Sequence, residues 1–337
     1  MGRPVRIAHI GPAALPVGYA FGAAVERRMI DLAVAQQERG DDVLVISAAL
    51  RTAEPRPPGP ARELRVIDIA CRLEQPLGDM ELALRARAPL FVFDADVIHV
   101  HNSFTAAVCL AGVGGAKVLS FDHFMFRGSE RPLVKAVYRR ALRSFDLLMP
   151  TSEFSARAAA EYWSMPLTHY RVLHSGVNVE RFYCDDTGGR RTPDGQLVIG
   201  YLGPLDDQAE AEILRGALQL VKTMHPQATL VVADPTVGVD VWDMVRSFDV
   251  CVIANRQERE IAAAQLLSAG TSVVCCDRGS LRGGSPGDAA ALAEELIALC
   301  DERSCLARVA AAPAEARPFT WDAVAEQADG FYRELLS

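Results

Sequence analysis

The sequence lacks any apolar run that approaches the ~18 residues of a membrane-spanning helix. Its first residues also lack the apolar stretch and cleavage site of a secretory leader. There is no excess of basic residues, because the formal net charge is −8, and this argues against general binding to nucleic acid or to anionic membranes. We therefore expect a cytoplasmic protein with no membrane span and no nucleic-acid partner.

The eight cysteines form neither a CxxC pair nor a Cys/His group with the spacing of a zinc finger. Three of them, Cys251, Cys275 and Cys276, lie in apolar strand-like runs, where a free thiol behaves as a small apolar group. Reduced, buried thiols are typical of a cytoplasmic protein. The sequence therefore predicts no metal site and no cofactor.

What the sequence does contain is a regular alternation of short apolar strands and helical stretches. The 337 residues are enough for about two domains. Predicted strands cover residues 5–10, 43–47, 97–101, 117–121, 147–150 and 170–173, and predicted helices cover 26–40, 103–111, 132–145 and 153–163. Continuous apolar strands between helices predict a parallel sheet that is covered on both faces.

A polar stretch rich in glycine and proline interrupts this alternation at residues 178–196 and predicts a linker. The alternation then restarts, with predicted strands at 197–202, 229–233, 250–254 and 272–276. We therefore predict two Rossmann-like, doubly wound α/β domains, at residues 1–177 and 197–317. Ligands of such folds bind at the carboxyl ends of the strands, so we expect the site in a cleft between the domains.

Six stretches of the sequence form a recognisable series of motifs. They are the glycine-loop segment 7–43, DVIHVHNSF (96–104), MPTSEFSARAAAEYW (149–163), RVLHSGVNVERF (171–182), VIGYLGPL (198–205) and the closing segment 318–336. Taken in this order, they resemble the motifs of the family 4 glycosyltransferases of the GT-B fold. The resemblance implies an acceptor-side first domain, a donor-side second domain and a last helix, within 318–337, that returns to the first domain. The second domain is shortened relative to the family. The resemblance also implies sugar transfer from a nucleotide-linked donor, which is a substrate and not a cofactor, to a small acceptor.

The first donor motif of the second domain departs from the family's G-R-L-x-x-E-K-G pattern. Gly203 matches its first glycine, but Pro204 stands in place of the arginine and Ala209 in place of the lysine. In the family these two cations grip the diphosphate, whose developing negative charge must be stabilised during transfer. The passage after the predicted strand 229–233 is also shorter than the resemblance implies.

The second donor motif has lost its charge as well. Gln257 and Gln265 stand where the family has two glutamates, and Glu260 fills the position of a glycine that lets the donor sugar approach. Glutamine keeps the hydrogen-bonding capacity but carries no charge. Arg259 in the same segment either replaces a lost cation or pairs with a neighbouring glutamate.

The first domain keeps more of the family's pattern. Gly18, Gly22 and Ala23 resemble the glycine loop that faces the diphosphate, with Ala23 in place of the second glycine. The resemblance therefore assigns these three residues to donor binding.

Candidate catalytic side chains follow two predicted strands of the first domain. His101 ends one strand, and Asp122 and His123 follow the next, where the family has a histidine that contacts the donor sugar. An imidazole with a pKa near neutrality can act as a general base or as a hydrogen-bond donor. His99 is the better candidate for a buried core histidine, and Asp122 and His123 form either a functional pair or a simple turn.

Two functions of different classes fit these observations. The first is an active glycosyltransferase with an atypical donor site, and the second is an inactive pseudo-glycosyltransferase that binds a protein partner, a second copy of the chain or a metabolite. The retained first domain favours the first, and the lost donor-site charges favour the second. The alanine- and arginine-rich composition suggests a bacterial source.

The missing cations predict weak binding of common nucleotide-sugars. Each lost charged hydrogen bond costs on the order of 1.5–3 kcal/mol, so two losses weaken binding by roughly 100-fold or more. We expect calorimetric titration with UDP-, GDP- and ADP-sugars to give dissociation constants well above the micromolar range. A micromolar value for any of them would show that the donor motif has been misread.

Overall fold

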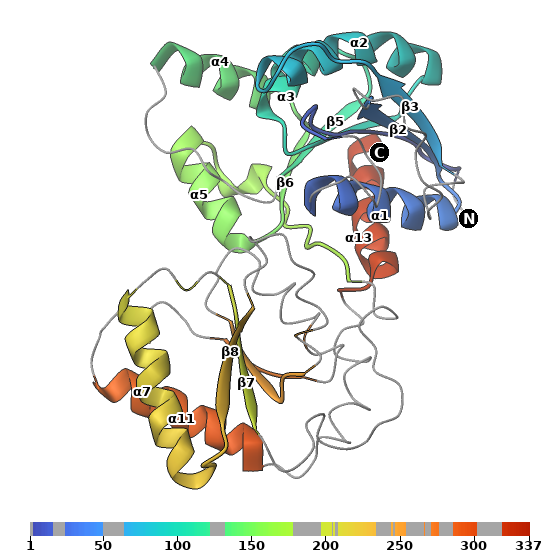
Figure 1. Cartoon of the computed structure of the whole chain (residues 1–337). Coiled ribbons are helices and arrows are strands. Elements are labelled where there is room, and N and C mark those ends of the chain that lie inside the picture. Colours follow the sequence, from blue (N-terminus) through green and yellow to red (C-terminus); the bar gives the residue numbers. More distant parts are fainter. Residues whose placement is uncertain are drawn as a thin grey trace. The chain divides into compact units, whose positions relative to one another are not determined.

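The protein consists of two compact units, each of which is described by itself (Figure 1). The first comprises Met1–Gly176 and Trp321–Ser337, and the second comprises Val177–Thr320. The computed structural model describes residues 3–15, 24–49, 64–121, 132–177, 197–203, 205, 208–233, 244, 247–253, 266, 271–275, 286–301 and 319–337. Among these residues, no helix combines the length and the apolar character needed to cross a bilayer.

A six-stranded parallel sheet forms the centre of the first unit. Its strands are β1 (Arg6–Ile10), β2 (Asp42–Ala48), β3 (Arg65–Ile69), β4 (Val97–His101), β5 (Ala116–Phe121) and β6 (Leu147–Pro150). They lie in the order β3-β2-β1-β4-β5-β6. All five residues of β4 are buried, as expected for a central parallel strand with helices on both faces.

Helices cover both faces of this sheet. They are α1 (Ala24–Glu38), α2 (Leu77–Phe93), α3 (Phe104–Leu110), α4 (Pro132–Leu142), α5 (Glu153–Trp163), the 3-10 helix η2 (Leu167–His169) and the last helix α13 (Trp321–Leu336). Helices α1 and α13 lie side by side on one face, and α2 and α3 lie on the other (Figure 1). Helices α3 and α5 begin at Ser103 and Ser152, whose hydroxyls accept the backbone N–H groups of Ala106 and Ser155.

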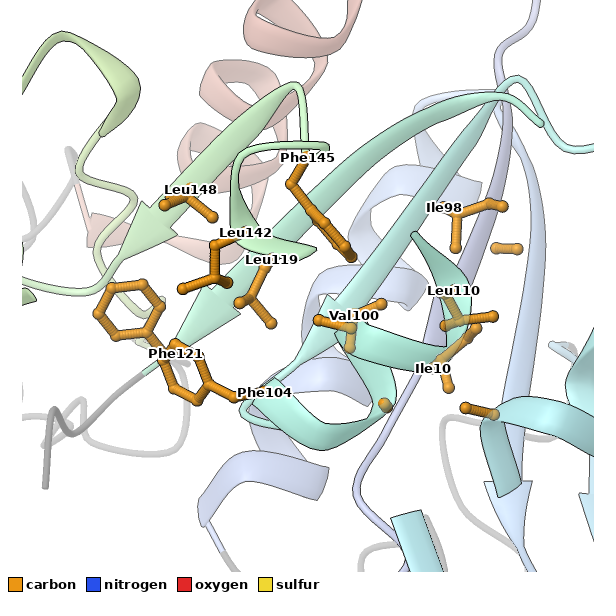
Figure 2. Packing of buried hydrophobic residues seen from close by; sticks show 14 of the residues in the cluster. Ile10, Ile98, Val100, Phe104, Leu110, Leu119, Phe121, Leu142, Phe145 and Leu148 are labelled. Carbon is orange, nitrogen blue, oxygen red and sulfur yellow. The ribbon is translucent and has the colours of Figure 1, made fainter. Parts of the chain in front are cut away.

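Apolar side chains fill the space between the sheet and the α2/α3 layer, as Figure 2 shows. Ile98 and Val100 of β4 point into it from the sheet, and Leu110 of α3 packs against them. The rings of Phe104 and Phe121 lie with their centres 5.4 Å apart. This layer is wholly apolar in its centre, in contrast to the opposite face of β1 and β4.

The second unit contains a smaller parallel sheet. Its strands are β7 (Val198–Leu202), β8 (Thr229–Ala233), β9 (Val250–Ile253) and β10 (Ser272–Cys275), in the order β10-β9-β7-β8. Helices α7 (Gln208–Met224) and α11 (Pro286–Asp301) pack against each other and against one face of it. At the chain ends of this unit, the N–H of Val177 donates to the carbonyl of Phe319.

The α/β fold class and its parallel sheets are as the sequence predicts, with two omissions and one error. The sequence analysis missed β3, an edge strand whose pattern is interrupted by Asp68, and α2, which contains Pro89 and has no clear polar face. The predicted strand at 170–173 is wrong, because this segment is not a strand of the sheet. It does run beside β6, with one bridge between Tyr170 and Leu148 and with the N–H groups of Arg171 and Leu173 donating to carbonyls of β6.

A glycine in β7 offers a test of the packing in the second unit. A Cβ atom on Gly200 would overlap the ring of Phe248, which is 1% exposed and has no room to move. We expect Gly200→Ala to lower the free energy of unfolding by about 1–3 kcal/mol, as overpacking does. Chemical denaturation followed by circular dichroism measures the change.

The matched control is Gly330→Ala in α13. This glycine is exposed and has open space around its Cβ position, and alanine is the better helix former, so stability should stay equal or rise by up to about 1 kcal/mol. Wild-type stability in Gly200→Ala would contradict the packing described for Phe248.

Candidate functional site

Three of the segments singled out in the sequence follow neighbouring strands of the first sheet. The segment after β1 leads to the glycine loop, β4 ends at His101, and β5 ends at Phe121, directly before Asp122. Strands β1, β4 and β5 are adjacent and parallel, so their carboxyl ends meet at one edge. From β1 the strand order continues through β2 to β3 on one side, and from β4 it continues through β5 to β6 on the other side. Ligands of doubly wound sheets bind at the point between two such strands, where the strand order reverses.

Most of the predicted site residues lie outside the described residues. They are Gly18, Gly22, Ala23, Asp122 and His123 of the first domain, and Gln257, Arg259, Glu260 and Gln265 of the second. Their roles stay predictions. Two predicted site residues, His101 and Gly203, are described.

Gly203 directly follows β7 in the second unit. Its φ is +136°, a conformation that side-chain-bearing residues rarely adopt. Its N–H donates to the carbonyl of Ala233 at 2.9 Å. The backbone conformation therefore favours glycine at position 203, independently of any role in ligand binding.

His101 is buried, with 1% of its surface exposed, and both its ring nitrogens have protein partners. Nδ1 lies 3.1 Å from the hydroxyl of Ser120, and Nε2 lies 2.9 Å from Nδ1 of His9. The sequence analysis proposed this imidazole as a general base or a hydrogen-bond donor at the site. In this structure its hydrogen bond to Ser120 joins the ends of β4 and β5.

A chain of hydrogen bonds runs from the last helix through His101 to Ser120. The side-chain amide of Gln36 determines which atom donates and which accepts in each of these bonds. The amide nitrogen of Gln36 donates to the carboxylate of Asp329 at 3.1 Å, so the amide oxygen faces Nε2 of His9 at 2.8 Å. Nε2 of His9 must therefore carry the proton. It follows that Nδ1 of His9 accepts from His101, whose own Nδ1 accepts from Ser120.

A third histidine, His99, stacks on His101 with ring centres 4.0 Å apart. It lies beside His9 in the β1–β4 register and points to the same face. Its Nδ1 is 2.7 Å from the hydroxyl of Tyr332 in α13. Its Nε2 is buried and has no hydrogen-bond partner among the described residues, a state that typically costs about 1–3 kcal/mol.

Burial keeps these three rings neutral. It lowers the pKa of His9 to about 4 and holds the pKa values of His99 and His101 well below the ordinary range, and nearby Arg28 lowers all three further. One nitrogen from each ring lies within 4.8 Å of the other two. Among the described residues this is the one group of side chains with the composition and spacing to hold a metal ion.

Charged side chains on α1 and α13 surround the same network. Arg39 contacts Asp329 at 3.2 Å and Asp322 at 2.8 Å. Burial and the nearby Asp41 raise the pKa of Asp329 to about 6, against the opposing effects of Gln36 and Arg39. These bonds fix α13 to α1 and to the sheet.

The sequence analysis missed a residue that supports the candidate edge. Asp79 of α2 is 7% exposed, and its carboxylate accepts the N–H of Ala13, after β1, and the hydroxyl of Ser103, after β4, both at 2.7 Å. Between β4 and Ser103, Asn102 has a left-handed φ of 50°, which asparagine tolerates. No local motif reveals Asp79, because its partners lie far away in the sequence.

A hollow of about 1050 Å³ lies between α3 and α4 and is lined by Lys135, Arg139, Arg140 and Arg143, among others. It includes the carboxyl ends of both helices. Its lining runs along α4 from Pro132 to Ser144, and none of the predicted site residues that the structure describes is among the residues that line it.

Comparisons with known proteins agree with this architecture. Residues 25–181 match the family Glycosyltransferase Family 4, and curated protein sequences give no match. A glycosyltransferase structure from Rickettsia africae aligns with a TM-score of 0.67 and 14% identity over 100% of both chains. A sucrose-phosphate synthase from Thermosynechococcus elongatus gives 0.67 and 17% over 98% of this chain and 99% of its own. HepE from Anabaena, in complex with UDP and glucose, gives 0.62 and 12% over 98% and 100%.

The GT-B fold predicted from the sequence is thus confirmed by structures that cover nearly the whole chain. The resemblance to family 4 is confirmed over residues 25–181, which lie almost entirely in the first unit. At these low identities the structures themselves establish the fold and nothing further.

The buried histidines predict that acid destabilises the protein. In the unfolded chain a histidine takes up a proton near pH ~6.5, whereas His9 in the folded chain does so near 4. The unfolded state therefore binds more protons, and the free energy of unfolding falls as the pH drops below ~6.5, by about 1.4 kcal/mol per pH unit for each such histidine. Asp329, with its raised pKa of about 6, offsets part of this loss between pH ~4 and ~6.

We expect His99→Gln to reduce the slope of unfolding free energy against pH by about 1.4 kcal/mol per pH unit near pH 5. Denaturant titrations at several pH values, in EDTA-containing buffer, measure the slope. His169→Gln, which replaces an exposed histidine in η2, should keep the wild-type slope. An unchanged slope in His99→Gln would mean that this ring is not kept neutral by burial.

Proposed function

We propose that the protein transfers a sugar from a nucleotide-linked donor to a small acceptor, at the carboxyl edge of the first sheet. The observation that carries this proposal is topological. Strands β1, β4 and β5 are neighbours, so the segments that resemble family 4 motifs start from one edge, next to the point where the winding direction changes. The family match covers β4 and β5 and most of this unit.

The proposed donor is a nucleoside diphosphate sugar. HepE, which shares the fold, is described in complex with UDP and glucose, and this supports the same class of donor here. Backbone N–H groups of the Gly18–Ala23 segment would then stabilise the leaving diphosphate. On the donor side we assign Gly203, Gln257, Arg259, Glu260 and Gln265, with Arg259 as the one cation among them.

For the chemical step we assign His123 as the group that contacts the reacting sugar or acceptor, as a base or a hydrogen-bond donor. Asp122, its neighbour, would orient the ring if the turn after β5 brings the two side chains together. His101 acts through Ser120, which lies two residues before Asp122 in β5, and so positions the end of that strand.

The second candidate function is a binding protein that keeps the fold without catalysis. Pro204 and Ala209 in place of two cations, and Gln257 and Gln265 in place of two glutamates, favour it. Its ligand would be a metabolite, a protein partner or a second copy of the chain. The two candidates differ in turnover, since only the first makes a glycosidic product.

A screen for turnover tests the choice. Wild-type protein is incubated with UDP-, GDP- and ADP-sugars and a panel of small acceptors, and products are detected by mass spectrometry. We expect transfer with at least one pair, and a fall of about 10²–10⁴-fold in His123→Ala, because that is the usual effect of removing a positioned base. His169→Ala, an exposed histidine outside the proposed site, is the matched control and should keep the wild-type rate.

A different experimental result would contradict each part of the proposal. Wild-type transfer by His123→Ala would show that the catalytic assignment is wrong while the protein is still an enzyme. Nucleotide-sugar binding without turnover for any acceptor would favour the binding protein. His123→Ala should unfold at the wild-type temperature, which separates lost chemistry from lost structure.

A further inference from the structure

We propose that His9, His99 and His101 form a binding site for a divalent ion of the zinc class inside the first unit. This proposal does not depend on the sugar-transfer reaction proposed above, although it shares His101 with it. It was not predicted from the sequence, because His9 is about ninety positions away from the other two and shows no ligand spacing with them.

The β1–β4 register brings the three ligands together. His9 pairs with His99 across the two strands, and His101, two residues further along β4, points to the same face. One nitrogen from each ring lies within 4.8 Å of the others, and His9 Nδ1 and His101 Nε2 are 2.9 Å apart. Nitrogens around a tetrahedral Zn²⁺ lie roughly 3.3 Å apart, so small side-chain shifts would complete the site.

The outward-facing nitrogen of each ring is already held by an oxygen of the protein. Nε2 of His9 contacts the amide oxygen of Gln36 at 2.8 Å, and Nδ1 of His101 contacts the hydroxyl of Ser120 at 3.1 Å. The third partner is the hydroxyl of Tyr332, 2.7 Å from Nδ1 of His99. Hydrogen bonds of this kind orient metal-binding histidines and fix their tautomers.

The remaining nitrogen of His99 gives the independent reason to expect a ligand. Its Nε2 is completely buried and has no hydrogen-bond partner among the described residues, although both nitrogens of His9 and of His101 are engaged. Buried polar atoms without a partner are rare and often mark an ion or water that binds there. A metal ion bound by all three rings would satisfy this atom.

Binding needs no proton to leave the site. The proton on Nε2 of His101, which now bridges to Nδ1 of His9, would move to Nδ1 of the same ring and be donated to Ser120. Nδ1 of His9 and Nε2 of His101 then give their lone pairs to the metal. Nε2 of His99 does so with its proton on Nδ1, donated to Tyr332, so three nitrogen–metal bonds replace one hydrogen bond.

The ligand chemistry selects the class of metal. Three neutral imidazoles suit zinc, copper, nickel or cobalt, whereas magnesium and calcium require oxygen ligands. Three protein ligands leave one position of a tetrahedral ion for water. The positive charge of the ion is opposed by Arg28 and is offset in part by the buried carboxylate of Asp329, which reaches His9 through Gln36 and also pairs with Arg39.

An ion here would strengthen the attachment of the last helix. Tyr332 belongs to α13, and its bond to His99 would become part of the metal's surroundings. Because α13 is separated from β4 by the whole second unit in the sequence, metal binding would stabilise the closure of the first unit around both chain segments.

Metal analysis tests the site. Full-length protein is stripped with EDTA, equilibrated with Zn²⁺, dialysed for long enough to allow entry to a buried site, and analysed by mass spectrometry. We expect about one tightly held ion per chain, a rise in unfolding temperature with Zn²⁺, and loss of both in His99→Gln. His169→Gln, at an exposed histidine, should behave as wild type.

Tyr332→Phe provides the second variant, because it keeps all three ligands and removes one supporting hydroxyl. We expect its Zn²⁺ affinity to fall about 10–100-fold. With Co²⁺ in place of Zn²⁺, visible absorption bands without a thiolate charge-transfer band would assign the ion to nitrogen ligands and exclude the cysteines.

Four results would overturn the proposal. The first two are wild-type protein that retains no ion and a cobalt spectrum dominated by thiolate. The third is wild-type affinity in a folded His99→Gln, and the fourth, which applies if His99→Gln misfolds, is wild-type affinity in Tyr332→Phe. Any of them would leave the three rings as a hydrogen-bonded core cluster. Sugar transfer is measured in the same preparations before and after EDTA, and its loss or survival bears on the function alone.

Discussion

The first unit depends on one constraint, which is that a row of polar side chains is buried between the sheet and the α1/α13 layer. Imidazoles in an apolar interior must have hydrogen-bond partners. Here the partners are Gln36 of α1 and Tyr332 of α13. The last helix therefore provides more than apolar cover, because without it His99 would lose its hydroxyl partner and Gln36 its carboxylate, Asp329.

The same row connects the interior to the candidate edge of the sheet. His101 is bonded to Ser120, and the N–H of Asn102 donates to the carbonyl of Ser120 at 2.7 Å. Asp79 fixes the segments after β1 and β4 from the opposite face. The ends of three neighbouring strands are thus held by buried polar contacts, which is the kind of rigid support that a binding or catalytic loop needs.

The second unit has a different character among its described residues. Its core is apolar around β7, α7 and α11, and close packing at Gly200 against Phe248 leaves no space for a side chain. Gly203 then turns the chain directly after β7 with a φ that excludes most residues. Backbone geometry thus explains this glycine, whereas the loss of two cations at Pro204 and Ala209 is inferred only from the resemblance to the family motif.

The sequence by itself determined most strands, most helices and a family resemblance of the first domain, because buried parallel strands leave continuous apolar runs and their order survives as motifs. It did not reveal β3, α2 or Asp79, since an edge strand, a helix without a polar face and a carboxylate with distant partners have no local pattern. The tertiary structure alone decided that His101 is buried and joined to His9 and His99. The reason is register, because only the pairing of β1 with β4 brings residues ninety positions apart onto one face.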